Sequence, residues 1–192
     1  MTHAAPQQDV PRQDVDFQDY LELDTGEQRL EWISGHVYAM AGGTQRHNLM
    51  TGLIYSRLQE GALAKGCSPY VENRRLRTPS TGHYPDVMVV CTPPADEQYE
   101  TDANLLVEVL SPSTQDVDRR EKPLVYAGLP SFELYLLVDP DHVSIEVGQS
   151  RAGRLRWTRY GPGEVIDTAY GPLVVDELYA SVDRVAVRKT QP

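Results

Sequence analysis

Short apolar runs alternate with polar segments along the chain, and the strongest of these runs predict strands. The clearest three cover residues 84–91, 104–110 and 134–138. Such continuous apolar character is typical of strands that are buried on both faces of a sheet. Two hairpins are also predicted, from 29–33 with 36–40 around Ser34-Gly35, and from 142–147 with 155–160.

Apolar residues at helical spacing predict three helices between these strands. The first covers 17–23. Thr44 can cap the second, whose apolar face contains Leu49, Leu53, Ile54 and Leu58. The third is expected to begin near Arg119 or Arg120, because Pro123 is tolerated only in the first turn of a helix.

The order of these elements, strands alternating with helices, predicts a mixed α/β (α+β) domain. The chain has 192 residues, of which 40% are hydrophobic, which is enough to bury one core. We expect a single domain over residues 17–183, a disordered N-terminal tail over 1–16 and a C-terminal tail over 184–192.

Charge and targeting signals narrow the classes of function. Twenty-eight acidic residues against 18 basic ones give a net charge of -10, so any contact with nucleic acid must be local. The first 16 residues lack the apolar core of a secretory signal, and no run is as long as a membrane span. These features predict a cytoplasmic protein that does not enter membranes.

The two cysteines, Cys67 and Cys91, lie far from each other in the sequence. They lack the close spacing of a zinc or redox motif and are too few to define a disulfide framework. We therefore expect two free thiols.

Asp86 and Glu108 are the most informative residues, because each is a single carboxylate in a run of apolar residues. An unpaired charge in such a strand is costly unless a cation or a proton compensates it. If the two strands are neighbours, both side chains can reach one end of the sheet and share a cation.

Hard oxygen ligands favour Mg²⁺ or Mn²⁺, and such an ion can polarise a phosphoryl oxygen and lower the pKa of an attacking water. Lys122 comes after Glu108 in the sequence, beyond a turn-rich segment. The chain can fold back there, so that Lys122 reaches the same end of the sheet. There it could position the water or stabilise the charge of a pentacovalent phosphorus. The sequence thus favours hydrolysis of phosphodiester bonds, with Asp86 and Glu108 as metal ligands.

At these residues the chain resembles the PD-(D/E)XK nuclease superfamily. Pro85-Asp86 matches the first half of that motif, whereas Glu108-Val109-Leu110 has leucine in the place of the lysine. More closely, the chain resembles the Uma-two (Uma2) family of restriction-endonuclease-like proteins, in which this leucine is common. The resemblance covers about 17–179 and rests on the segments 31–40, 108–114 and 129–132 with His47, Pro85-Asp86, Asp118, Lys122, Tyr126, Tyr135, Trp157, Tyr160 and Leu178-Tyr179.

The resemblance implies a restriction-endonuclease-like fold, with a mixed central sheet, flanking helices and extra hairpins near both ends. It implies that Glu31 and His47 approach the same site, that the substrate is DNA rather than RNA, and that the protein is a homodimer.

Structural interpretations of the same residues remain open. Asp86 could cap a turn, Glu108 could pair with an arginine (Arg74, Arg75 or Arg77), and Lys122 could lie on a solvated helix face. His47 could be a helix-terminus group that only supports a carboxylate. The arginines at 119, 120, 151, 154, 156 and 159 could be ordinary surface residues.

Two other functions also remain open. The missing motif lysine and the acidic charge suit an interaction or regulatory module that has lost its chemistry. A metal-assisted hydrolase of another phosphate ester is the third possibility.

Overall fold

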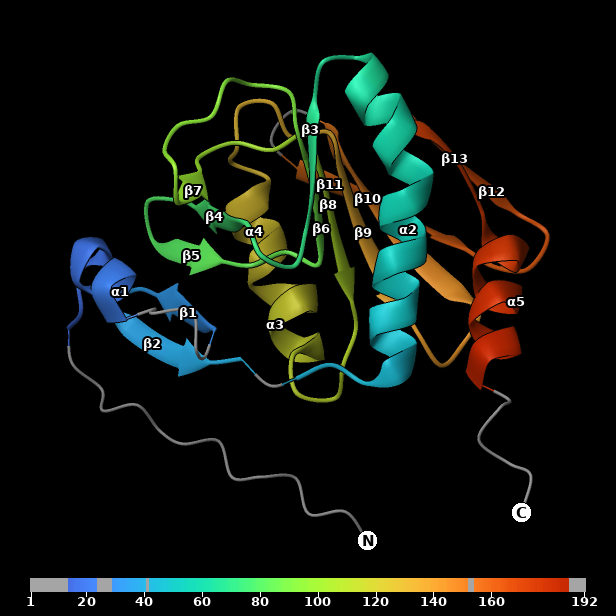
Figure 1. Ribbon diagram of the computed structural model, residues 1–192, viewed down its shortest axis with the longest axis horizontal. Coiled ribbons are helices and arrows are strands. Elements are labelled where there is room, and N and C mark those ends of the chain that lie inside the picture. The colour runs from blue at the N-terminus through green and yellow to red at the C-terminus, as the bar shows by residue number, and fades with distance from the viewer. Residues whose placement is uncertain (1–13, 24–28, 41, 152–153, 187–192) are drawn as a thin grey trace, which may run out of the picture.

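The computed structural model describes residues 14–23, 29–40, 42–151 and 154–186, and in these ranges a mixed sheet lies between two layers of helices (Figure 1). The helices are α1 (Phe17–Leu23), α2 (Gln45–Ala64), α3 (Gln115–Arg120), α4 (Lys122–Tyr126) and α5 (Val175–Ala186). The strands are β1 (Leu30–Ile33), β2 (His36–Ala39), β3 (Ser68–Val71), β4 (Arg75–Arg77), β5 (Thr81–His83), β6 (Val87–Val90), β7 (Tyr99–Glu100), β8 (Leu105–Val109), β9 (Leu134–Asp139), β10 (Ser144–Arg151), β11 (Arg154–Tyr160), β12 (Val165–Thr168) and β13 (Gly171–Val174). No helix in these ranges is both long and apolar enough to cross a membrane.

The central sheet has the strand order β11-β10-β9-β8-β6-β3. Strands β8 and β9 are parallel, and the chain between them forms α3 and α4. The other neighbouring pairs are antiparallel, including the predicted hairpin of β10 and β11. The predicted mixed sheet with flanking helices is therefore confirmed.

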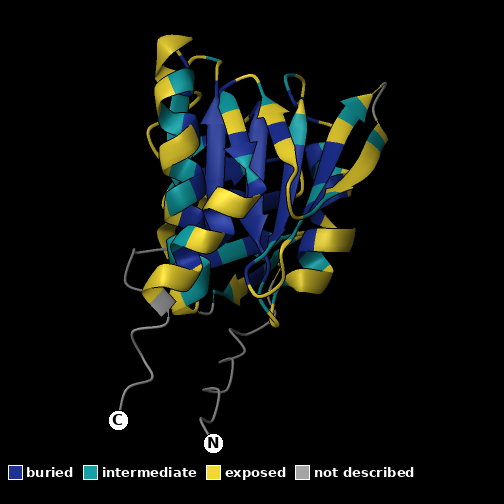
Figure 2. Ribbon diagram, turned by 90° about the vertical axis from the view of Figure 1, so that its right-hand side faces the viewer, coloured by how far each residue is buried: buried dark blue, intermediate teal, exposed yellow. Residues whose placement is uncertain are grey.

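Both faces of the central sheet are buried, as the apolar runs predicted. In β8, Leu105, Val107 and Val109 pack in the core beneath α2 and α5, whereas Leu106 belongs to the core beside α4. Figure 2 shows the result, with buried strands between helices whose outer surfaces are exposed. A strand that contributes to two cores can carry a charged residue only where that charge is compensated.

A second sheet, β2-β1-β5-β4-β7, packs at the N-terminal end of the domain (Figure 1). The predicted β1–β2 hairpin closes at Ser34 and Gly35, which have φ angles of 48° and 86°. Positive φ at both positions is what a tight two-residue turn requires, and glycine adopts it without strain. From β5 the chain passes through Tyr84-Pro85-Asp86 into β6, and so crosses from this sheet into the central one.

Helix α2 begins at the predicted cap. The Thr44 hydroxyl accepts a hydrogen bond from the backbone N–H of His47, which fixes the first turn. Near the other end of the helix, Gly61 allows the backbone of Tyr170 to approach closely, because a Cβ at Gly61 would lie 2.0 Å from the Tyr170 carbonyl oxygen. The helix is thus docked at one end, while His47 in its first turn lies 3.2 Å from Asp86 at the start of β6.

Three element boundaries differ from those expected. The segment after β8 forms two short helices, so that α3 begins at Gln115 and Lys122 begins α4. Helix α5 ends at Ala186, so the boundary expected at 183 falls inside a helix. Val15 falls within the disordered tail expected from the sequence, but its N–H donates to the Gly35 carbonyl, so it belongs to the folded unit. Residues 1–13 of that tail lie outside the described residues.

The prediction of two free thiols is wrong, because Cys67 and Cys91 form a disulfide. Strands β3 and β6 pair with Ser68 opposite Val90, so the residues one step outward, Cys67 and Cys91, face each other with Cα atoms 4.2 Å apart. The bond depends on the register of two strands, which the cysteine spacing does not reveal.

Two glycines of α2 provide a test of how this helix is docked. We expect Gly61→Ala to lower the free energy of unfolding by at least ~2 kcal/mol, since the new methyl group collides with backbone and not with a movable side chain. Gly52→Ala is the matched control: nothing lies within 4 Å of its Cβ position, so better helix propensity should raise stability by up to ~1 kcal/mol. Denaturant unfolding of both variants checks this, and equal effects would contradict the close approach.

Candidate active site

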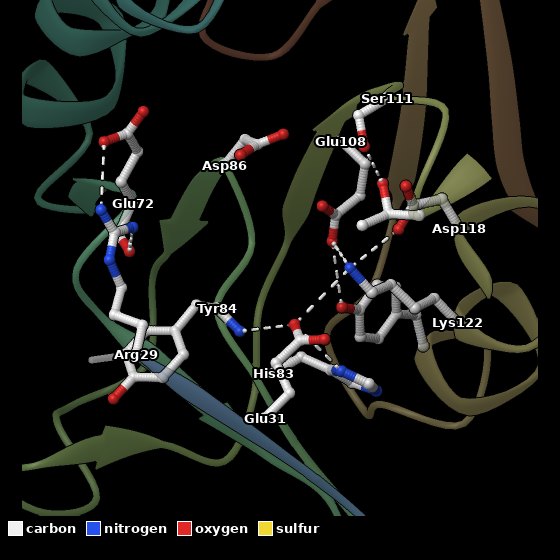
Figure 3. A network of polar contacts seen from close by, with 12 residues as sticks. Arg29, Glu31, Glu72, His83, Tyr84, Asp86, Glu108, Ser111, Asp118 and Lys122 are labelled. Carbon is white, nitrogen blue, oxygen red and sulfur yellow. Dashed lines mark hydrogen bonds and ion pairs between the residues drawn. The ribbon is translucent and has the colours of Figure 1, made fainter. Parts of the chain in front are cut away.

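Asp86 and Glu108 lie side by side at one end of the central sheet. Strands β6 and β8 pair with Val87 opposite Val107, so one further step places Asp86 opposite Glu108. Directly opposite residues of antiparallel strands project from the same face. Figure 3 shows the two carboxylates on these neighbouring strands, with Lys122 beyond Glu108.

Each of the two carboxylates uses one oxygen for contacts with the protein. Asp86 Oδ2 accepts a hydrogen bond of 2.7 Å from the backbone N–H of Val109 and lies 3.2 Å from His47 Nε2. Glu108 Oε1 accepts from Lys122 Nζ at 2.8 Å and from the Tyr126 hydroxyl at 3.3 Å. The other oxygens, Asp86 Oδ1 and Glu108 Oε2, have no hydrogen bond to any residue that the structure describes.

The Lys122 ammonium is the centre of the site. The residue is 3% exposed, and its Nζ lies 2.8 Å from Glu108 Oε1, 2.9 Å from Asp118 Oδ1 and 3.8 Å from Glu31 Oε1. Pro123 comes next in the chain and fits the first turn of α4, so the lysine is held at the point where this helix begins. The ion-pair partner of Glu108 is Lys122 and not one of the arginines considered from the sequence, of which Arg74 pairs with Glu100.

Glu31 comes to the lysine from the second sheet. Strands β1 and β5 pair with Trp32 opposite Gly82, so Glu31 is opposite His83. Glu31 Oε1 accepts from the backbone N–H of Tyr84 at 3.3 Å and lies 3.3 Å from His83 Nδ1. The two sheets therefore meet at this residue.

The five residues named from the sequence form one connected group: Asp86, Glu108, Lys122, Glu31 and His47. Lys122 joins Glu108 to Glu31, His47 contacts Asp86, and the Val109 amide links Asp86 to the strand that carries Glu108. The structure adds three residues that sequence reasoning did not assign to the site: Asp118, Tyr126 and His83. Asp118, Lys122 and Tyr126 are spaced by four residues, a helical pattern that could have indicated them. His83 has no such signal, since its proximity to Glu31 depends on strand register.

Burial and the excess of negative charge set the protonation states. Burial raises the pKa of Glu108 well above its usual range, and the charges on Asp118 and Asp86 add to this against the opposing effect of Lys122. Burial would lower the pKa of Lys122, but Glu108, Glu31 and Asp118 together raise it well above normal. Lys122 thus remains protonated, while Glu108 holds a proton more readily than an exposed glutamate.

The pKa values of Glu31 and His47 shift in opposite directions. Burial would raise the pKa of Glu31, but Lys122 and the contacts with His83 and Tyr84 lower it to about 2. Burial would lower the pKa of His47, but its hydrogen bond to Asp86 and the charge of that carboxylate raise it. Glu31 is therefore ionised at neutral pH, and His47 is more readily protonated than a free histidine.

The two carboxylate oxygens without a hydrogen bond to a described residue are of the chemical type that hard divalent cations bind. Asp86 Oδ1 and Glu108 Oε2 are carboxylate oxygens, which Mg²⁺ and Mn²⁺ prefer over softer ligands. In the described part of the chain no three residues among His, Cys, Asp and Glu converge to hold a metal. Mg²⁺ commonly binds one or two carboxylates and completes its shell with water and substrate phosphate, so the pair suits Mg²⁺ better than it suits a zinc site.

Comparisons with known proteins agree with this arrangement of elements. A family model described as "Uma2: Putative restriction endonuclease" matches residues 17–173. Two uncharacterized proteins of Synechocystis sp. are similar: slr1290 is 31% identical over 68% of this chain and 71% of its own length, and sll1609 is 28% identical over 68% and 76%. A "putative nuclease belonging to DUF820" from Anabaena variabilis shares the fold, with a TM-score of 0.72 over 86% of this chain and 97% of that one, at 15% identity.

Glu31→Gln tests the electrostatics of the site without touching Asp86 or Glu108. A shift from 4.5 to about 2 at a side chain that is 13% exposed corresponds to about 3 kcal/mol of stability. Because the folded pKa is the lower one, this contribution is complete above pH 4.5 and disappears as the pH falls towards 2. We expect the parent to be more stable than Glu31→Gln at pH 7 and the difference to vanish near pH 2, measured by denaturant unfolding.

The control for this experiment is Glu177→Gln, whose carboxylate is 56% exposed and pairs with Arg57 at the surface. Its effect should stay within ~0.5 kcal/mol at every pH. A difference between the parent and Glu31→Gln that does not change with pH would contradict the low pKa of Glu31.

Proposed function

The chain belongs to the Uma2 family, and from this membership and the geometry of the site we propose a nuclease that hydrolyses phosphodiester bonds in DNA with Mg²⁺ or Mn²⁺. The observation that carries the proposal is the buried Lys122 ammonium beside Glu108. It supplies from α4 the amine that the motif would have at position 110, where this chain has a buried leucine.

In this proposal Asp86 and Glu108 hold the cation, each through the oxygen that has no hydrogen bond to the described protein. The bound ion would polarise a phosphoryl oxygen and make the attacking water more acidic. His47 and the Val109 amide keep Asp86 oriented through its other oxygen.

Lys122 acts as a hydrogen-bond donor. Because its pKa is raised, it is not the base that takes the proton from water. A protonated amine at that position orients the water and stabilises the negative charge that develops on the phosphoryl oxygens. Asp118 and Glu31 position the ammonium and keep it charged.

A catalytically silent interaction module is the second candidate. It is favoured by the observation that Glu108 and Asp86 already have partners within the protein, and by the net charge of -10. Assembly as a homodimer remains a prediction from the family resemblance, and a cytoplasmic location remains a prediction as well.

Cleavage of duplex DNA with Mg²⁺ or Mn²⁺ separates the two candidates. We expect the parent to cleave and Asp86→Asn, Glu108→Gln and Lys122→Gln each to lose at least about a hundredfold in rate, because each removes a ligand or the charge that stabilises the transition state. Glu177→Gln, far from the site on α5, should cleave at the parent rate. A parallel assay with RNA of the same sequence tests the choice of DNA.

Two outcomes would contradict the nuclease proposal. One is cleavage that persists in Asp86→Asn or does not need a divalent ion. The other is a folded parent that cleaves neither DNA nor RNA under any of these conditions, which would favour the interaction module.

Calorimetric titration of Mn²⁺ tests the metal ligands independently of turnover. Because Glu108 has a raised pKa, a proton competes with the ion, and binding should strengthen as pH rises, by up to about tenfold per unit below that pKa. Glu108→Gln should bind Mn²⁺ at least about tenfold more weakly and lose most of this pH dependence. Equal affinity in the parent and the variant would exclude Glu108 as a ligand.

A further inference from the structure

Strand register connects the site to a pair of arginines at the far edge of the central sheet. Glu108 on β8 is opposite Leu137 on β9, Leu137 is opposite Glu146 on β10, and Glu146 is opposite Arg159 on β11. Residues in one row of a sheet project from the same face. Arg159 is therefore on the same face as Glu108, three strands away, or about 14 Å at the usual strand spacing.

A second arginine reaches the same point from the helix that carries Asp118. Arg119 Nη1 on α3 donates to Glu146 Oε1, and Arg159 Nη2 lies 3.5 Å from the same oxygen. One carboxylate thus anchors two guanidinium groups and leaves one positive charge in excess. The side chains of Arg119 and Arg159 remain 35% and 72% exposed, so a ligand in solvent can reach both.

The pair lies at the edge of the sheet, in a chain with a net charge of -10. The edge strand β11 contains no acidic residue, and Arg159 projects from the face of Glu108, whereas Arg154 and Arg156 alternate with it and project from the other face. Trp157 of the same strand is 40% exposed and packs against the Tyr135 ring. An acidic protein that binds a polyanion needs such a local concentration of cations near its site.

We propose that Arg119 and Arg159, held together by Glu146, bind backbone phosphates of the DNA strand that enters the site. The inference rests on the proposed nuclease function and names the surface that holds the substrate. Guanidinium groups bind phosphate oxygens through paired hydrogen bonds. A distance of about 14 Å corresponds to roughly four nucleotides along a B-form strand, so the contact lies beside the scissile bond and not at it.

Binding of a fluorescent DNA duplex, measured by anisotropy in EDTA over a series of salt concentrations, tests this contact without cleavage. The variant Arg119→Gln/Arg159→Gln should bind about tenfold more weakly, equally for unrelated sequences, and its salt slope should fall by about 2, or roughly 0.9 for each phosphate contact. In the cleavage assay, KM should rise while kcat changes by less than about threefold, because the lost contacts are far from the reacting atoms.

The matched control is Arg57→Gln/Lys65→Gln, which makes the same change in net charge on α2 and at its C-cap, on the opposite face of the central sheet. Its affinity and salt slope should stay close to those of the parent. Arg159→Gln alone provides a variant that must fold, since its side chain is 72% exposed, and it should lower the slope by about 0.9.

The outcomes separate this proposal from the nuclease function. Equal affinity and slope in both double variants, with cleavage by the parent, would overturn the arginine contact and leave the nuclease intact. A parent that neither binds nor cleaves nucleic acid would overturn both. Weaker binding and a smaller salt slope in Arg119→Gln/Arg159→Gln alone would support the contact.

Discussion

The ion pair between Lys122 and Glu108 is the interaction on which the arrangement of this site depends. Both residues are almost fully buried, and a buried charge without a partner is expensive. The pair therefore fixes the start of α4 against β8, and Asp118 strengthens the same constraint from α3. Removing one member of such a pair typically costs about 3–5 kcal/mol, because the other charge stays buried alone. The protein thus maintains a charged cluster in its core whose strength depends on all members being present.

The topology explains why these charges meet. The chain leaves β5 in the second sheet at His83 and enters β6 in the central sheet after Asp86, so one short link brings elements of both sheets to the same end. Glu31 arrives on β1, which pairs with β5, and Glu108 arrives on β8, which pairs with β6. Strand pairing alone is therefore sufficient to bring these carboxylates together, and α4 then contributes the cation that compensates them.

Local signals in the sequence predicted the local structure well. Ser34-Gly35 indicated a turn that needs positive φ, Thr44 indicated a helix cap, and the apolar runs indicated strands buried on both faces. The same runs identified Asp86 and Glu108, because a lone carboxylate is conspicuous among apolar residues.

What the sequence could not indicate depends on register between distant segments. The Cys67–Cys91 disulfide requires the pairing of β3 with β6, and the contact of His83 with Glu31 requires that of β5 with β1. Lys122 was identified from its position after Glu108, and its four-residue spacing from Asp118 is a local signal, but the break at Glu121 between two short helices has no apolar period to reveal it. For the disulfide and the His83 contact the information lies in the tertiary structure and has no local pattern.

The distribution of charge reconciles an acidic protein with a polyanionic substrate. Three carboxylates around one lysine, with Asp86 on the neighbouring strand, repel phosphate, and in the proposed function a divalent cation reverses that repulsion at the point of chemistry. Repulsion over the rest of the surface is offset only where cations gather, as Arg119 of α3 and Arg159 of β11 do on the same face as Glu108. The arginines lie three strands away from Glu108, so they do not neutralise the carboxylates of the site directly. The arginines and the carboxylates can therefore each bind a different part of the ligand. An arginine placed beside Glu108 would instead displace the cation that the chemistry requires.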